Sequence, residues 1–117
     1  MSDDCLFCKI INKKLPAAVV AESENCIAIE DKFPQAPVHC LVIPKRHIVS
    51  LHTAADSDAA LLGEMLILSK KCADAKGVGE GGYRVLTNIG ADGGQAVFHI
   101  HFHILGGKRL GAKLVQP

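Results

Sequence analysis

Three histidines that alternate with apolar residues are the part of the chain best suited to chemistry. His99, His101 and His103 lie within FHIHFHILGG, residues 98 to 107, and they are half of the six histidines in the sequence. A neutral imidazole acts near pH 7 as a nucleophile, a general acid or base, or a metal ligand. The alternation predicts a β-strand over residues 97–105 with all three histidines on one face. The apolar residues expected on its other face are Phe98, Ile100, Phe102 and Ile104.

Strand geometry limits what a metal ion could do with this row of histidines. Histidines two positions apart are separated by roughly 6.6 Å at Cα, and the outer two by about 13 Å. Zn–N bonds are only about 2.0–2.1 Å long. One ion could therefore bind two of these side chains, but not all three from a straight strand. At least one histidine must have another role.

The loop before the predicted strand suits an anionic substrate. It contains Gly90, Gly93 and Gly94, followed by Gln95. Backbone N–H groups that glycine-rich turns expose bind anions such as phosphate. A plain hairpin turn is the alternative interpretation. The loop indicates phosphoryl or nucleotidyl chemistry because it leads directly into the histidine strand.

A second group of possible metal ligands lies near the N-terminus. Cys5 and Cys8 form a C-x-x-C, which is the spacing of a zinc half-site. A redox role is less favoured because the βαβ context of such motifs is missing. Cys26, Cys40 and Cys72 lie in apolar patterns and are expected to be small buried hydrophobic residues.

The elements that must position these groups follow from apolar periodicity and turn residues. A short helix is expected before Pro16, and a long helix over residues 56–76 with Leu61, Met65, Leu68 and Cys72 facing the core and Leu62 and Leu66 widening that stripe. Because strands and helices do not alternate regularly, the order favours an α+β fold with a five-stranded antiparallel meander and both helices on one face. The strands are expected at residues 18–22, 26–31, 39–44, 83–88 and 97–105.

Composition and charge exclude several classes of protein. The 117 residues are 49% hydrophobic and suit a single domain over residues 1–117. A net charge of +1 with scattered Lys and Arg gives no electrostatic case for nucleic-acid binding. No apolar run approaches the roughly 18 residues of a membrane span, and the N-terminus lacks the positive region of a signal peptide. We expect a cytoplasmic protein that binds neither nucleic acid nor membranes.

The sequence HIHFHIL resembles the signature of the histidine triad (HIT) superfamily, H-x-H-x-H followed by two apolar residues. The segments CLFCKIINKKLPA, DKFPQAPVHCLVIPKRH and YRVLTNIGADGGQAVFHIHFHILGG are similar to its Hint branch, the histidine triad nucleotide-binding proteins. The resemblance implies a single HIT domain and a homodimer whose two sheets join into a ten-stranded sheet. It also implies a hydrolase that binds AMP and GMP and cleaves nucleoside 5′-phosphoramidates and acyl-adenylates through a nucleotidyl-histidine.

The resemblance implies roles for individual residues. His101 is the nucleophile, and His103, His99 and His39 contact phosphate oxygens or support it. Asp31 accepts from the ribose hydroxyls, and no metal is required for the chemistry. The implied nucleotide-binding residues are Phe7, Ile10, Ile29, Asp31, Lys32, Asn88, Gly94, Gln95, Ala96, Val97, His101 and His103, with Phe7, Ile10 and Ile29 around the base.

Two positions depart from the family's pattern. Ala96 stands where the family often has a serine that helps to protonate the leaving group, which places amine leaving groups in doubt. Lys32 stands where an apolar residue often follows the aspartate that contacts the ribose, so base or ribose contacts are open to change.

Some HIT proteins bind a structural zinc ion, which this chain could hold through Cys5, Cys8, His47 and His99. Cys₂His₂ is an accepted tetrahedral ligand set. Three alternatives to the hydrolase remain open: a nucleotide-binding regulatory module with incidental hydrolysis, a dinucleoside polyphosphate hydrolase, and a zinc-holding structural protein.

Overall fold

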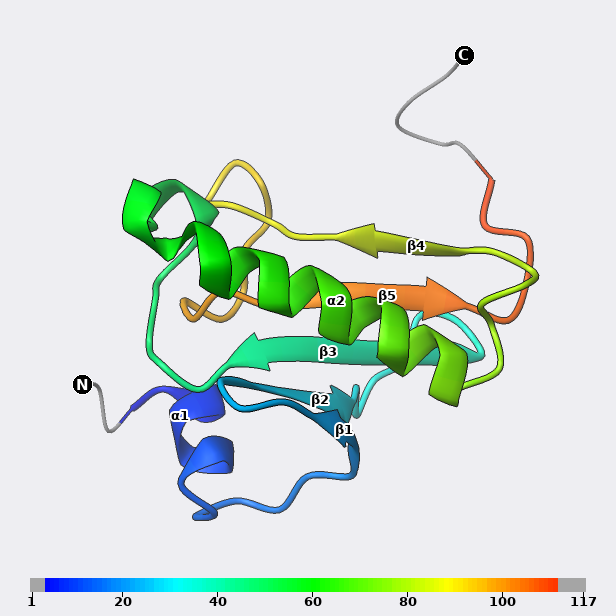
Figure 1. The fold of residues 1–117 in the computed structure, drawn as a ribbon, viewed down its shortest axis with the longest axis horizontal. Coiled ribbons are helices and arrows are strands. Elements are labelled where there is room, and N and C mark those ends of the chain that lie inside the picture. The colour runs from blue at the N-terminus through cyan, green and yellow to red at the C-terminus, as the bar shows by residue number, and fades with distance from the viewer. Residues whose placement is uncertain (1–3, 112–117) are drawn as a thin grey trace.

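The computed structural model describes residues 4–111 as an α+β fold with five strands and two helices. Figure 1 shows the long helix α2 lying along one face of the sheet. The predicted five-stranded antiparallel sheet with one long and one short helix is confirmed. The elements are α1 (Leu6–Ile11), β1 (Val19–Glu22), β2 (Cys26–Glu30), β3 (Val38–Pro44), 3₁₀ turns at Leu51–Thr53 and Asp56–Asp58, α2 (Ala59–Ala75), β4 (Tyr83–Leu86) and β5 (Phe102–Gly106).

The strand order is β1-β2-β3-β5-β4, with every neighbouring pair antiparallel. This order departs from a simple meander, because β5 returns between β3 and β4. Phe102 and Ile104 of β5 are buried, whereas the middle of β4 is exposed, so the more apolar strand takes the interior position. His103 consequently lies opposite Leu41 of β3 and Leu86 of β4.

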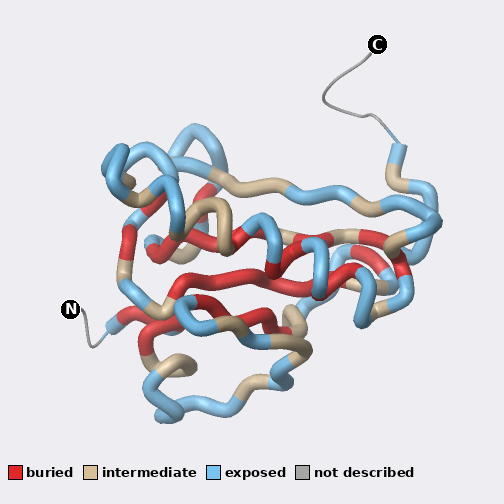
Figure 2. Tube along the Cα trace, viewed as in Figure 1, coloured by how far each residue is buried: buried red, intermediate tan, exposed pale blue. Residues whose placement is uncertain are grey.

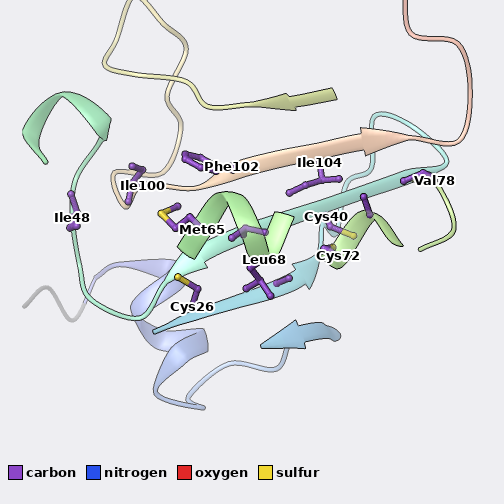
Figure 3. Packing of buried hydrophobic residues seen from close by; sticks show 13 residues of the cluster. Cys26, Cys40, Ile48, Met65, Leu68, Cys72, Val78, Ile100, Phe102 and Ile104 are labelled. Atoms are coloured by element: carbon purple, nitrogen blue, oxygen red, sulfur yellow. The ribbon is translucent and has the colours of Figure 1, made fainter. Parts of the chain in front are cut away.

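The sheet has a hydrophobic core on each face. Under α2, Met65, Leu68 and Cys72 pack against residues such as Cys26 and Cys40 of the sheet (Figure 3). On the other face, α1 and the alternate residues of β2 and β3 form a second cluster. The two helices therefore cover opposite faces, and the expectation that both lie on one face is wrong. The second cluster consists of Cys5, Phe7, Cys8, Ile27, Ile29, Leu41 and Ile43.

Burial on both faces explains the continuous apolar sequences of β2 and β3. A short uninterrupted apolar run is typical of a strand without a solvent face. β3 is buried along nearly its whole length, as Figure 2 shows. Cys26, Cys40 and Cys72 are fully buried free thiols, as predicted.

The long helix begins at Ala59, after a 3₁₀ turn, and not at Asp56 as predicted. Its predicted core stripe is buried at Met65, Leu68 and Cys72, with Leu61 packed at the edge. Leu66 is 54% exposed, so the expected widening of the stripe at this residue is wrong. Within residues 4–111, no helix has the length and apolar character needed to cross a membrane.

Candidate active site and candidate metal site

The row of histidines does not lie on one continuous strand. Regular pairing begins only at Phe102, and the backbone of residues 97–99 forms a bend. Phe98 is 54% exposed and His99 is fully buried, which reverses the facing predicted for these two residues. The bend is held by the backbone N–H of Ile100, which donates to the Ile48 carbonyl at 2.6 Å. The His99 ring therefore faces Cys5 and Cys8, whereas the His101 and His103 rings lie next to each other.

His101 has one ring nitrogen held by the backbone and the other free of any protein partner in the described structure. Nδ1 lies 2.8 Å from the His99 carbonyl oxygen, and it must donate because that oxygen only accepts. In the neutral ring Nε2 therefore carries the lone pair. The Thr87 hydroxyl donates to the His101 carbonyl at 2.8 Å, and the Phe7 ring meets the imidazole edge-on with centroids 4.9 Å apart. These contacts fix both the backbone and the ring of His101.

Asp31, His39 and His103 form what we call the carboxylate–histidine group. His39 Nδ1 accepts from the backbone N–H of Gln35 at 3.0 Å, so the proton of the neutral ring lies on Nε2. This Nε2–H points to His103 Nδ1 at 2.9 Å and lies 3.4 Å from Asp31 Oδ2. The His101 and His103 rings are adjacent, with centroids 5.0 Å apart. The structure thus joins His39, His101 and His103 in one chain of rings.

Burial keeps the triad histidines uncharged at neutral pH. Desolvation lowers the pKa of His101 and, together with the neighbouring His101 and His39, lowers the pKa of His103 to about 4. A neutral imidazole is the nucleophilic form. The arrangement therefore presents an uncharged His101 that is oriented for attack by its Nε2 atom.

The predicted base-binding residues come together on the α1 face of the sheet. Phe7 and Ile29 are buried in the second core cluster, and Ile10 and Val97 pack against it. Asp31 follows β2 directly, and its Oδ1 accepts from the Phe33 backbone N–H at 2.7 Å. The carboxylate of Asp31 therefore lies two residues along the chain from Ile29, a member of the apolar cluster. Lys32 is exposed.

The glycine-rich loop is braced by the side chain of Gln95. Its Oε1 accepts from the Gly90 N–H at 2.9 Å, and its Nε2 donates to the carbonyls of Val49 and Val97 at 2.6 and 3.0 Å. The Gln95 side chain is thus committed to the protein, and only its backbone remains for a phosphate. Gly94 has a φ of 78°, a conformation that favours glycine. This bracing role was not predicted, because the sequence pattern alone shows no direction for the amide.

The two remaining predicted residues of the phosphate region lie at the edges of this loop. Asn88 is half-buried and follows Thr87, the residue that supports the His101 backbone. Ala96 is exposed, and it lines a cavity of about 430 Å³ together with Val97 and Phe98. The position at which the family often has a serine is therefore open to solvent and presents a methyl group.

Cys5, Cys8, His47 and His99 form what we call the cysteine–histidine group, as predicted from the sequence. Their donor atoms all lie within 4.8 Å of one another. The Cys5 and Cys8 sulfurs lie 3.3 and 3.6 Å from His99 Nδ1, and the Cys8 sulfur lies 3.3 Å from His47 Nδ1. In tetrahedral zinc with Zn–S of about 2.3 Å and Zn–N of about 2.0–2.1 Å, sulfur and nitrogen ligands are roughly 3.6 Å apart. The four side chains fit this ion.

The surroundings of the cysteine–histidine group support the same interpretation. His99 Nε2 donates to the Pro44 carbonyl at 2.8 Å, which leaves Nδ1 unprotonated and directed at the thiols. Metal-bound histidines commonly have their second nitrogen held in this way. Burial and the adjacent Cys5 raise the pKa of the Cys8 thiol to about 11. A cation is what would allow this thiol to ionise at neutral pH.

Comparison with known proteins identifies the family. The HIT domain matches residues 12–110. An uncharacterized HIT-like protein of Synechocystis sp. (strain PCC 6803) is 47% identical over 108 residues, covering 92% of this chain and 94% of that protein.

Solved structures of HIT proteins share the fold. A HIT family hydrolase from Legionella pneumophila has a TM-score of 0.91 at 47% identity, covering 94% of this chain and 98% of that one. A histidine triad nucleotide-binding protein from Candida albicans has a TM-score of 0.84 at 32% identity, covering 97% and 85%. The chain therefore belongs to the HIT domain family.

Proposed function

We propose that this protein is a purine nucleotide hydrolase that releases AMP or GMP from nucleoside 5′-phosphoramidates and acyl-adenylates. The observation that carries the proposal is the bond from His101 Nδ1 to the His99 carbonyl, which presents a neutral Nε2 for attack. The similar structures named as a HIT family hydrolase and as a nucleotide-binding protein support it.

The proposed reaction has two displacements at the α-phosphorus. His101 Nε2 attacks, the bond from phosphorus to the leaving nitrogen or acyl oxygen breaks, and its electron pair departs with the leaving group. A leaving nitrogen takes up one proton from solvent as it departs as the amine, whereas a leaving carboxylate needs none. Water then attacks phosphorus, the P–Nε2 bond breaks, and the pair returns to His101 while the water proton is released. His103 and His39 are assigned to the phosphate oxygens, because the pair lies next to the His101 ring.

The nucleoside is proposed to bind on the α1 side of these histidines. The base is assigned to Phe7, Ile10 and Ile29, and the ribose hydroxyls to Asp31. Asn88 and the backbone of Gly94 to Val97 are assigned to the phosphate. The apolar side chains of this region, of which Phe7 and Ile29 are buried and Ile10 is partly buried, support the assignment, since a purine ring needs a flat apolar site with a polar edge for the sugar.

The test is a search for the covalent intermediate. Mixing the protein with a fluorogenic adenosine phosphoramidate and quenching is expected to show one AMP added to the chain by intact mass, and peptide mapping is expected to place it on His101. His52 is an exposed histidine outside the site and serves as the control in a His52→Gln variant. AMP release at an unchanged rate in a His101→Ala variant would refute the proposal.

Ala96 gives some support to one alternative, a nucleotide-binding module with incidental hydrolysis. If the missing hydroxyl limits protonation of amine leaving groups, Ala96→Ser is expected to speed phosphoramidate cleavage up to about tenfold by general acid catalysis. Acyl-adenylates have a carboxylate leaving group that needs no proton, and their cleavage is expected to change little. AMP binding with no turnover of either substrate would favour the binding module. Turnover of diadenosine polyphosphates instead would indicate a dinucleoside polyphosphate hydrolase.

We further propose that Cys5, Cys8, His47 and His99 hold a structural zinc ion, and that the chain is a cytoplasmic homodimer. Zinc would tie the start of α1 to the segments that follow β3 and precede β5, and it would take no part in the reaction. The five free cysteines suit a reducing compartment. The edge strand β4 with its exposed Val85, and the exposed Leu66 and Ile67 on α2, support a dimer interface. Light scattering after gel filtration tests the dimer, and elemental analysis tests the zinc.

A further inference from the structure

Phe33 is the most exposed large hydrophobic residue of residues 4–111, and it lies next to the proposed nucleoside site. The residue is 79% exposed, and no other large hydrophobic residue in this part of the chain is more than 54% exposed. It follows Asp31, the residue assigned to the ribose, by two positions. Single exposed apolar residues are common on protein surfaces, so the exposure alone indicates no role. The way in which the backbone of Phe33 is held does indicate one.

The backbone of Phe33 is anchored on both sides of its Cα atom. Its N–H donates to Asp31 Oδ1 at 2.7 Å, and its carbonyl accepts from the Gln35 side chain at 3.1 Å. Pro34 comes next in the chain, and a following proline restricts the backbone of the residue before it. An ordered loop therefore presents the exposed ring, and a ligand that contacts the ring would cost little backbone entropy.

The same loop is joined to a histidine of the candidate active site. The Asp31 N–H donates to the His39 carbonyl at 2.9 Å, and the Gln35 N–H donates to His39 Nδ1 at 3.0 Å. Asp31 Oδ2 lies 3.4 Å from His39 Nε2, while Oδ1 holds the Phe33 N–H. Phe33 is thus bonded directly to the carboxylate assigned to the ribose. Its ring is close enough to reach a nucleoside bound there.

The residues assigned to the base all belong to one apolar cluster. Phe7 and Ile29 are buried in the second core cluster, and Ile10 packs against it. A base that rests on this cluster has its other face exposed to solvent unless a further side chain covers it. Lys32 is exposed, and its strongly hydrated ammonium group is a poor cover for a base. The adjacent Phe33 is an aromatic residue, and aromatic rings stack on the flat faces of bases.

We propose that Phe33 stacks on the outer face of the purine and so favours purine over pyrimidine nucleotides. The inference rests on the proposed function, because it takes the ribose to be bound at Asp31. A purine has the larger ring system and therefore removes more aromatic surface from water when it stacks. Phe33 contacts the base and no reacting atom, so its loss raises KM and leaves kcat nearly unchanged.

The experiment compares AMP with ribose 5-phosphate, which keeps the sugar and the phosphate but lacks the base. In NMR titrations, Phe33→Ala is expected to weaken AMP binding about tenfold, as for the loss of one stacked base, and to leave ribose 5-phosphate binding unchanged. Phe33→Tyr keeps an aromatic ring and is expected to retain the AMP affinity. Unchanged AMP affinity after Phe33→Ala, or equal losses for the two ligands, would overturn the proposal.

A second measurement uses the lack of tryptophan in the chain. Phe33→Trp places a single indole at the proposed contact, and AMP is expected to quench its emission more strongly than CMP does. Lys70→Trp is the control, because Lys70 is exposed on α2, which covers the face of the sheet opposite α1. Its emission is expected to be unchanged by AMP. Equal responses of the two variants to AMP, or no response of Phe33→Trp, would overturn the stacking contact.

The same titrations separate this inference from the proposed function. If AMP does not bind the unmutated chain, both are overturned. If AMP binds and Phe33→Ala does not weaken it, the stacking contact alone is overturned and the proposed hydrolase is retained. A lower molar mass of Phe33→Ala in light scattering, with unchanged AMP affinity, would place Phe33 between two copies of the chain and would also overturn the stacking contact.

Discussion

His99 and His101 are two residues apart and both buried, yet the structure prepares them for different chemistry. Each donates one ring N–H to a backbone carbonyl, at 2.8 Å in both cases. His99 uses Nε2 for this bond and directs Nδ1 to two thiols, whereas His101 uses Nδ1 and keeps Nε2 free. The backbone bond decides which nitrogen of each ring keeps its lone pair, and the position of the ring decides what that nitrogen faces, which is a pair of thiols for His99.

The largest expected effect comes from exchanging these two histidines for alanine in separate variants. His101→Ala is expected to lower kcat/KM for an adenosine phosphoramidate on the order of 10⁴-fold, because the proposed nucleophile is lost. His99→Ala is expected to act chiefly on the melting temperature, because it removes a proposed zinc ligand and the contact with Pro44. Steady-state kinetics and thermal melts of both variants measure the contrast. Equal losses of activity in both variants would break it.

Removal of metal is the next largest expected effect. A zinc ion present at 100 times its Kd would stabilise the fold by about 3 kcal/mol. A strong chelator is then expected to lower the melting temperature by roughly 10 °C. Cys5→Ser is expected to have a low melting temperature both with and without chelator. Cys40→Ser changes a cysteine of the other core, and its melting temperature is expected to fall with chelator as in the unmutated chain. A melting temperature that chelator does not move in the unmutated chain would exclude a stabilising ion.

Loss of the hydrogen bond that holds the His101 backbone is expected to have a smaller effect, which is on kcat/KM. Thr87→Val removes the hydroxyl that donates to the His101 carbonyl, an interaction worth about 1 kcal/mol. If the bond positions the nucleophile, kcat/KM falls roughly fivefold, while AMP affinity is retained. Thr87→Ser keeps the hydroxyl and is expected to restore the rate. Equal rates for the valine and serine variants would show that the bond does not act on His101.

The smallest effect concerns the acid limit of activity. Burial lowers the pKa of His101 below its ordinary value, and the neutral ring is the proposed nucleophile. The rate is therefore retained as pH falls past about 6.5, and it is lost only when pH falls through the lower pKa of the folded protein. A pH profile of kcat/KM measures this limit in the free enzyme. If kcat/KM of a folded sample already falls at a pH above 6.5, the expected lowering of the His101 pKa is contradicted.

Most of the helices and strands could be predicted because each is identified by a pattern of residues that lie close together in the sequence. The apolar runs CIAI and CLVI identify β2 and β3, and the i, i+4, i+7 spacing of Leu61, Met65 and Leu68 identifies α2. The same apolar runs do not show which face of the sheet each helix covers. When both faces of a strand are buried, the apolar pattern no longer distinguishes them.

The bend before β5 could not be predicted, because the alternating pattern continues unchanged through residues 97–105. It depends on contacts with distant residues, chiefly the Ile48 and Pro44 carbonyls. The inward direction of the Gln95 amide depends on Val49 in the same way. Residue types could thus indicate the members of the two histidine groups, while the separation between the groups arises from tertiary structure.

The N-terminal end of α1 has a consequence for nucleotide affinity. Cys5 caps this helix, its sulfur accepting from the Cys8 N–H, and the helix has only six residues. So short a helix is not stable by itself in water. Cys5 and Cys8, the two residues of this cap, are also two of the four proposed zinc ligands, and Phe7 and Ile10 of the proposed base site lie on the helix that they begin. Zinc and nucleotide would therefore be reciprocal effectors, each raising the affinity of the chain for the other by the same factor.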